Sequence, residues 1–196
     1  MLKNDREYRL FNQFEIRAMH NEEEQEEKWV EGYASRYDSP TILFEMDGIQ
    51  YKEQIVQGAF DSADMSDVIF QYDHQGKVMA RTRNKTLQLQ VDNNGLYVRA
   101  RLDGTEEGRR LYEEIKGGYI DKMSFGFTVK EDSYDNDEHM RNIRKIKKLY
   151  DCSAVSMPAY DSTNISARNY FESQKEETKR QESEKRRKKL ALIASL

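Results

Sequence analysis

The segment 122–128 restricts the fold of this chain more than any other stretch, because its side chains alternate between two kinds. Large apolar residues occupy every second position, and small or hydroxyl-bearing residues lie between them; the order is Lys122, Met123, Ser124, Phe125, Gly126, Phe127 and Thr128. A period of two predicts a β-strand with one apolar face. On the other face, the glycine near Ser124 leaves room for a second group to approach the hydroxyl. A barrel strand whose serine faces solvent or a neighbouring strand would show the same pattern.

Size and composition predict one domain with a modest core. The chain has 196 residues, of which 35% are charged, and its mean hydropathy is -0.99, so much of it belongs to the surface or to disordered segments. The 37% of hydrophobic residues, with twelve Tyr and eight Phe, still supply one core. The net charge of -4 gives no general case for a nucleic-acid partner.

Several other functional classes lack their usual sequence features here. The single cysteine, Cys152, excludes an internal disulfide and a cysteine metal cluster, and it suits a reducing compartment. The sequence has no phosphate-binding glycine loop, no His-Glu-x-x-His and no calcium-loop spacing, so we expect no cofactor and no metal. It also has no signal-like apolar run and no stretch of about 18 apolar residues. We therefore expect a cytoplasmic protein with no membrane partner.

Most of the body is expected to be β structure. Apolar or alternating runs bounded by turn residues predict strands at 8–19, 29–37, 42–55, 68–74, 78–83, 87–91, 96–102, 141–150 and 151–157. Within 42–55 the chain is expected to reverse at Asp47-Gly48, and a second hairpin is expected to turn across 92–95.

One helix is expected after residue 103. Asp103 is a candidate N-cap, and Glu106 three residues on completes a capping box. The small and apolar residues that share one face of this helix are Gly108, Leu111, Tyr112 and Ile115. Gly117 is expected to end the helix in the left-handed conformation. Two charged segments, 21–27 and 131–138, are expected to be an acidic loop and a polar turn.

The composition changes at Phe171. Residues 171–196 carry eight Lys/Arg and five Asp/Glu, a net charge of +3, which leaves -7 for residues 1–170 of a chain whose total is -4. This segment has few apolar side chains before Leu190 and no heptad pattern, so we expect a solvated helix or a disordered tail. The expected organisation is one domain at 1–170 and a charged tail at 171–196.

Among the three histidines, only His74 lies at the end of an apolar strand. His20 opens the acidic loop and His139 lies in the polar turn, so both are expected to be exposed. A serine hydroxyl becomes a good nucleophile only when a nearby base accepts its proton, and a neutral imidazole titrates in the useful range. These arguments pair His74 with Ser124 as candidate base and nucleophile, although a structural histidine at this position is a competing interpretation.

Asp151 is the candidate for a third group that would hold the imidazole in one tautomer. It follows Leu149-Tyr150 where a strand enters the core, and an ordinary strand-end aspartate would look the same. The next residue, Cys152, is an alternative nucleophile, but it alternates away from Asp151 in an apolar strand and is expected to pack as a small hydrophobic residue.

Three blocks of this sequence resemble the tailed-phage prohead (capsid maturation) protease family. In chain order they are 58–61 followed by His74, 117–118 with 123–127, and 150–151 with 155–160. Their order and spacing match as well, and the resemblance covers residues 8–170.

The resemblance implies a serine endopeptidase related to the herpesvirus assemblins, with a mainly β, barrel-like α+β fold ringed by helices. It implies Ser124 as the nucleophile, His74 as the base, and Asp151 at a position where many members have glutamate. Around His74, the segment 75–77 replaces the commoner Asp-Pro-rich loop, which bears on substrate contacts.

The resemblance also implies partners and a location. Family members cleave the scaffold segment of the major capsid protein, and often themselves, inside the immature capsid in the host cytoplasm, and self-association into a homo-oligomer is expected. Two rival functions remain: a scaffold or capsid-binding protein that kept the fold without activity, and a hydrolase that uses Cys152.

Overall fold

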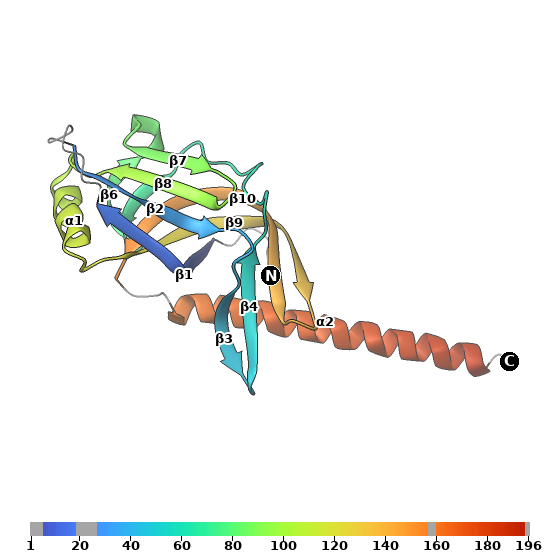
Figure 1. Cartoon of the computed structure of the whole chain (residues 1–196). Helices are drawn as coiled ribbons and strands as arrows, with labels where there is room; N and C mark the ends of the chain where they lie inside the picture. Colours follow the sequence, from blue (N-terminus) through green and yellow to red (C-terminus); the bar gives the residue numbers. More distant parts are fainter. Residues whose placement is uncertain (1–5, 19–26, 157–159, 195–196) are drawn as a thin grey trace.

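The computed structural model describes residues 6–18, 27–156 and 160–194. The described chain forms a mainly β body with two α-helices (Figure 1). Its elements are β1 (Glu7–Ala18), β2 (Trp29–Arg36), β3 (Thr41–Met46), β4 (Ile49–Ile55), β5 (Ile69–Tyr72), β6 (Gln75–Arg81), the 3-10 helix η1 (Thr82–Asn84), β7 (Leu87–Val91), β8 (Gly95–Arg101), α1 (Glu106–Lys116), β9 (Lys122–Asp135), β10 (Met140–Val155) and α2 (Tyr160–Ala194). Most of the strands predicted from the sequence are confirmed, but those predicted at 141–150 and 151–157 form one continuous strand, β10, and residues 82–83 of the predicted strand 78–83 belong to η1.

The strands hydrogen-bond in the order β3-β4-β10-β9-β1-β2-β8-β7, and the β5–β6 hairpin attaches to β10. β10 uses its outer edge twice, because β4 runs parallel to its first half and β5 runs parallel to its second half. The two ends of the path, β3 and β7, are not hydrogen-bonded to each other in the described residues. The mainly β class with packed helices is thus confirmed, whereas the described strands form an open sheet instead of the expected closed barrel.

The apolar face of β9 lies in the main core, as its alternation predicts. Met123, Phe125 and Phe127 are fully buried, and the rings of the two phenylalanines stack with centroids 4.8 Å apart. Cys152 and Ala154 of the neighbouring β10 enter the same core. The polar residues that alternate with these side chains on β9 and β10 consequently share the opposite face of the sheet.

The β9–β10 hairpin is longer than the sequence predicts. The segment 131–138 was expected to be a polar turn, yet β9 continues to Asp135. Its charged side chains pair across the hairpin, for example Glu131 with Lys145 at 2.6 Å and Asp132 with Arg141 at 2.7 Å. Cross-strand pairs of opposite charge stabilise a ladder outside the core, and a propensity argument based on single residues misses them.

At α1, the N-cap residue and the left-handed residue after the helix differ from those predicted. Its N-cap is Thr105, whose hydroxyl accepts from the Gly108 backbone N–H at 2.9 Å; Asp103 instead lies 3.3 Å from Arg101. The left-handed residue after the helix is Gly118 with φ of 74°, whereas Gly117 is right-handed. The predicted buried face is confirmed, and so is the turn at Asp47-Gly48, where both residues are left-handed.

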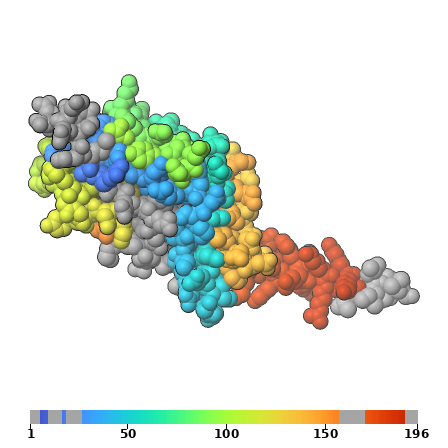
Figure 2. Space-filling view, in the orientation of Figure 1, coloured from blue at the N-terminus to red at the C-terminus, as the bar shows by residue number. Residues whose placement is uncertain are grey.

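α2 is a single helix that projects from the β body (Figure 2). Near its start, Tyr170 and Phe171 are buried, and the Phe171 ring packs on Phe44 and Tyr51 of the β3–β4 hairpin at centroid distances of 5.6 and 5.1 Å. Beyond this contact, residues 172–189 are mostly exposed. The boundary expected between residues 170 and 171 falls inside this helix, and the tail has the helical form of the two that were predicted.

Candidate active site

Ser124 lies on β9, with β10 on one side and β1 on the other. It is directly opposite Ser153 of β10 in the antiparallel ladder, and it pairs with Leu10 of β1. The pleat of β9 turns its hydroxyl away from the core, onto the polar face of the sheet. The residue is nevertheless only 2% exposed, so neighbouring side chains surround this hydroxyl.

His74 reaches the same face from a tight turn. Tyr72 pairs with Gln75, and the two residues between them, Asp73 and His74, both have positive φ, of 45° and 57°. This is the two-residue turn that matches the twist of a hairpin. The Asp73 carboxylate accepts from the backbone N–H of Ser156 at 3.2 Å, which ties the turn to the end of β10. The histidine at the end of a buried strand was predicted, but the left-handed turn was not.

The three residues singled out from the sequence form one hydrogen-bonded chain. His74 Nδ1 donates to Asp151 Oδ1 at 2.5 Å, and His74 Nε2 lies 2.6 Å from Ser124 Oγ. In the neutral imidazole the hydrogen bond to Asp151 fixes the proton on Nδ1, and Nε2 is then the acceptor for the serine proton. Asp151 is fully buried, and it lies on β10 opposite Gly126.

Gly126 provides space for this arrangement. A Cβ at position 126 would lie 2.7 Å from Asp151 Oδ2, 2.9 Å from the Tyr8 ring and 3.0 Å from Arg6 Nε. The sequence predicted that a glycine here would leave room beside Ser124. That room is present, and the Asp151 carboxylate and the side chains of Tyr8 and Arg6 occupy it.

Two further residues contact Asp151, and neither of them was predicted from the sequence. Arg6 forms an ion pair with Oδ2, and its guanidinium lies between the rings of Tyr8 and Tyr150, 5.1 and 4.7 Å from their centroids. Ser153 donates from its hydroxyl to Oδ1 at 3.1 Å. The two-residue spacing from Asp151 to Ser153 in a strand was a usable signal, whereas nothing local to Arg6 indicates a partner 145 positions away.

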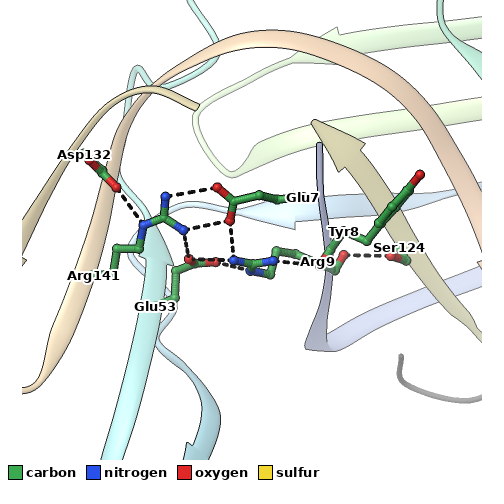
Figure 3. Close-up of polar contacts among 7 residues, drawn as sticks. All are labelled: Glu7, Tyr8, Arg9, Glu53, Ser124, Asp132 and Arg141. Atoms are coloured by element: carbon green, nitrogen blue, oxygen red, sulfur yellow. Dashed lines mark hydrogen bonds and ion pairs between the residues drawn. The ribbon is translucent and has the colours of Figure 1, made fainter. Parts of the chain in front are cut away.

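The start of β1 covers the serine. The Tyr8 ring packs against the His74 ring with centroids 4.4 Å apart. The Arg9 carbonyl accepts from Ser124 Oγ at 2.9 Å (Figure 3). The hydroxyl carries one proton, and two acceptors are in reach, the Arg9 carbonyl and His74 Nε2, so it donates to one of them at a time. In this arrangement the hydroxyl is closed to bulk solvent.

A buried ionic cluster anchors that segment to the sheet. Glu53 of β4 is fully buried and accepts from Arg9 at 2.5 Å and from Arg141 at 2.9 Å, and Glu7 contacts both arginines (Figure 3). The burial of the two guanidiniums is offset by these carboxylates, so the pKa of each arginine is raised above its ordinary value. The cluster joins β1, β4 and β10 beside the candidate site.

The surroundings lower the pKa of His74, the candidate base, and raise the pKa of Cys152, the alternative nucleophile. Burial, followed by the positive charge of Arg6, lowers the pKa of His74 to about 4, and Asp73 opposes this effect. His74 is thus neutral, the form in which it accepts a proton, throughout the neutral range. Burial raises the pKa of the Cys152 thiol to about 12, which deprives it of the thiolate needed for nucleophilic attack. Cys152 packs in the core, as predicted.

The other histidines do not join this site. His139 is partly buried instead of exposed: its ring lies 5.3 Å from the Tyr51 ring, and its Nδ1 lies 3.2 Å from the Tyr134 hydroxyl. His20 and most of the acidic segment 21–27 lie outside the described residues. Among the residues that are described, no three His, Cys, Asp or Glu side chains are grouped to hold a metal ion. Neither described helix offers an apolar stretch that would reach across a membrane.

A carboxylate, an imidazole and a serine hydroxyl joined in this order form the arrangement found in serine hydrolases. Comparison with known sequences identifies the family: the chain belongs to the caudovirus prohead serine proteases, whose family model matches residues 13–181. It is 30% identical over 148 residues to the prohead protease of Enterobacteria phage HK97, a match that covers 67% of this chain and 66% of that protein, just under two thirds of the relative's length. Among solved structures, the capsid assembly protease of bacteriophage T4 matches with 13% identity and a TM-score of 0.43, over 78% of this chain and 99% of that one.

Proposed function

We propose that this protein is a serine endopeptidase in which Ser124 is the nucleophile, His74 the general base and Asp151 the group that orients the imidazole. The observation that carries the proposal is the continuous contact chain from Asp151 Oδ1 through both ring nitrogens of His74 to Ser124 Oγ. Membership in the prohead serine protease family supports the same chemistry.

The contact chain suits each step of acyl transfer. His74 Nε2 removes the Ser124 proton as Oγ attacks a peptide carbonyl, and the imidazolium then donates that proton to the leaving amine. Asp151 stabilises the imidazolium, because its charge lies 2.5 Å from Nδ1. Water, activated by the same imidazole, releases the acyl group from Ser124. Because the hydroxyl is closed off by Tyr8 and Arg9, the substrate carbonyl reaches it only after a local rearrangement of β1.

The substrate is proposed from the relatives. We propose that the protein cleaves the scaffold segment of the major capsid protein, and itself, inside the immature capsid in the host cytoplasm; the name of one relative, a prohead protease, supports action on the prohead. Association of the protease into a homo-oligomer and its relation to the herpesvirus assemblins are proposed with it; the mainly β fold with two α-helices supports that relation.

Co-expression with the major capsid protein of the same phage tests the proposed function. We expect mass spectrometry to find a shortened capsid protein with wild-type protease and only the full-length capsid protein with Ser124→Ala. A matched control is Ser62→Ala, which changes an exposed serine outside the contact chain. Full-length capsid protein with wild-type protease, in assembled proheads, would overturn the proposal.

The non-catalytic scaffold or capsid-binding function is kept as a second candidate because Ser124 is almost fully covered in this arrangement. A fluorophosphonate probe distinguishes the candidates when it is applied to proheads and followed by peptide mapping. The protease proposal predicts a label on Ser124 that disappears in His74→Ala. A scaffold protein would carry no label at any stage of assembly.

A further inference from the structure

Ser153 is a buried hydroxyl that the proposed mechanism has not used. It lies on β10 two residues after Asp151, directly opposite Ser124, and β5 runs along its other side with Gln71 in register. Its side chain is fully buried, and its hydroxyl donates to Asp151 Oδ1 at 3.1 Å. A hydroxyl in the middle of a sheet is costly unless it is hydrogen-bonded, and here its partner is a carboxylate.

The two oxygens of Asp151 are held in different ways. Oδ2 accepts from Arg6, whose side chain is 35% exposed and comes from the segment just before β1. Oδ1 accepts from His74 Nδ1 and from Ser153, which is fixed in the central strand β10. Rotation of the carboxylate would take Oδ1 away from the imidazole, and the Ser153 contact is the one that opposes rotation from within the rigid sheet.

We propose that Ser153 is a positioning residue for the reaction: it holds Asp151 Oδ1 against His74 Nδ1 and takes up part of the negative charge of that oxygen. This inference rests on the proposed function, because it assigns Ser153 a part in orienting the proposed base. It does not require Ser153 to touch the substrate. Loss of its hydroxyl leaves Oδ1 with a single donor, so the carboxylate gains rotational freedom and its charge interacts more strongly with the imidazole.

Steady-state kinetics on the full chain test the positioning role. We expect Ser153→Ala to lower kcat about tenfold with little change in KM, because a hydrogen bond to a charged group is lost while substrate contacts are kept. Ser153→Thr keeps the hydroxyl and should recover most of kcat. Cys152→Ala is the matched control, since it truncates the adjacent side chain on the core face of the same strand; its kcat per folded molecule should be unchanged.

A second measurement does not depend on activity. The His74 ring is followed by NMR as a function of pH in the wild type and in Ser153→Ala. The charged groups that face this ring are Asp151 of β10, Asp73 of its own turn and Arg6. With more charge left on Oδ1, the titration midpoint of His74 should move upward in Ser153→Ala and return in Ser153→Thr. Cys152→Ala should titrate as the wild type does.

The two measurements together decide the inference. Ser153→Ala with an unchanged His74 midpoint would overturn it, whatever the thermal stability of the variant, because a purely structural serine lowers the melting temperature without moving that midpoint. A wild-type value of kcat in Ser153→Ala would overturn it as well. If the wild type itself cleaves nothing, the proposed function fails, and the NMR titration still shows whether Ser153 holds the Asp151–His74 pair.

Discussion

Gly126 on β9 lies opposite Asp151 on β10, and the missing side chain of the glycine leaves the space in which the carboxylate lies. A Cβ at position 126 would be 2.7 Å from Asp151 Oδ2, a distance that real Cβ atoms essentially never show. Because Asp151 is fully buried and contacts His74, the carboxylate cannot move aside without losing the imidazole. Gly126 is thus as much a part of the site as the groups that carry charge.

Gly126→Ala should impair both folding and catalysis. The added methyl displaces Asp151 Oδ2 or Arg6, so we expect a loss of about 1–3 kcal/mol of unfolding free energy and a fall in kcat. Gly104→Ala is the matched control, because nothing lies within 4 Å of a Cβ at that position. Denaturant unfolding and peptide cleavage measure the two effects. Equal stability and activity of the two variants would show that the site at Gly126 is looser than described.

The pH dependence follows from the lowered pKa of His74. The sequence alone predicted an ordinary histidine, and hence a rise in kcat/KM through roughly pH 6–7. With the pKa at about 4, His74 is already neutral in that range, so kcat/KM should be flat there and fall only as the pH approaches 4. An acid limb at pH 6–7 in the wild type would contradict the burial and charge argument.

Arg6→Gln tests the electrostatic part of that argument. Removing the cation raises the pKa of His74 towards its ordinary value, so the acid limb should move to higher pH. Arg17→Gln on β1 is the control, because Arg17 pairs with Glu31 and has no contact with His74 in the described residues. The stability of the fold should also depend on pH. His74 binds a proton more tightly in the unfolded chain than in the folded one, because its pKa is lower in the folded protein. The stability contributed by neutral His74 is therefore lost as the pH falls from about 6.5 to 4.

Local patterns predicted most of the strands and singled out Ser124, His74 and Asp151, the three residues whose side chains the structure brings into contact. Alternation along 122–128 marks a strand whatever its neighbours are, and the change from apolar to polar residues before His74 marks a strand end. The two distances that join Asp151, His74 and Ser124, in contrast, depend on strand register. A local pattern could not predict the residues that surround Asp151. Arg6 comes from the other end of the chain, and the contact of Ser153 can be inferred only when the position of Asp151 is known.

The same limit explains the errors. Asp103 and Thr105 are both good N-cap residues, and a local pattern does not decide between them; in the structure the helix begins at Glu106, so Thr105 is the cap and Asp103 lies beside Arg101. The pKa of His74 was expected to be ordinary because neither its burial nor the Arg6 charge can be read from neighbouring residues.

Glu53→Gln should destabilise the fold strongly. Glu53 is fully buried between Arg9 and Arg141, and removing its charge leaves two buried guanidiniums short of a partner, which costs on the order of 3–5 kcal/mol. Glu138→Gln, which breaks the exposed pair with Lys52, should change stability by less than about 1 kcal/mol. Thermal and urea unfolding compare the two. Similar small effects would show that the buried cluster contributes little to stability.

The charged part of α2 should be dispensable for folding and important for packaging. Residues 179–189 are exposed and include five consecutive basic residues at 185–189, so a chain that ends at Thr178 should melt like the full chain and cleave a peptide, yet enter capsids poorly. A chain that ends at Tyr170 also loses the packing of Phe171 on Phe44 and should melt lower. Normal packaging of the chain ending at Thr178 would remove the docking role of the tail.

The most direct test of the account is cleavage of the capsid scaffold segment by purified Ser124→Ala beside the wild type, with melting curves to show that both are folded. No neighbouring hydroxyl can replace Oγ at 2.6 Å from His74, since Ser153 is directed to Asp151. The account predicts an unchanged melting temperature and a cleavage rate lower by about 10⁴-fold or more. A folded Ser124→Ala protein that cleaves at the wild-type rate would contradict it.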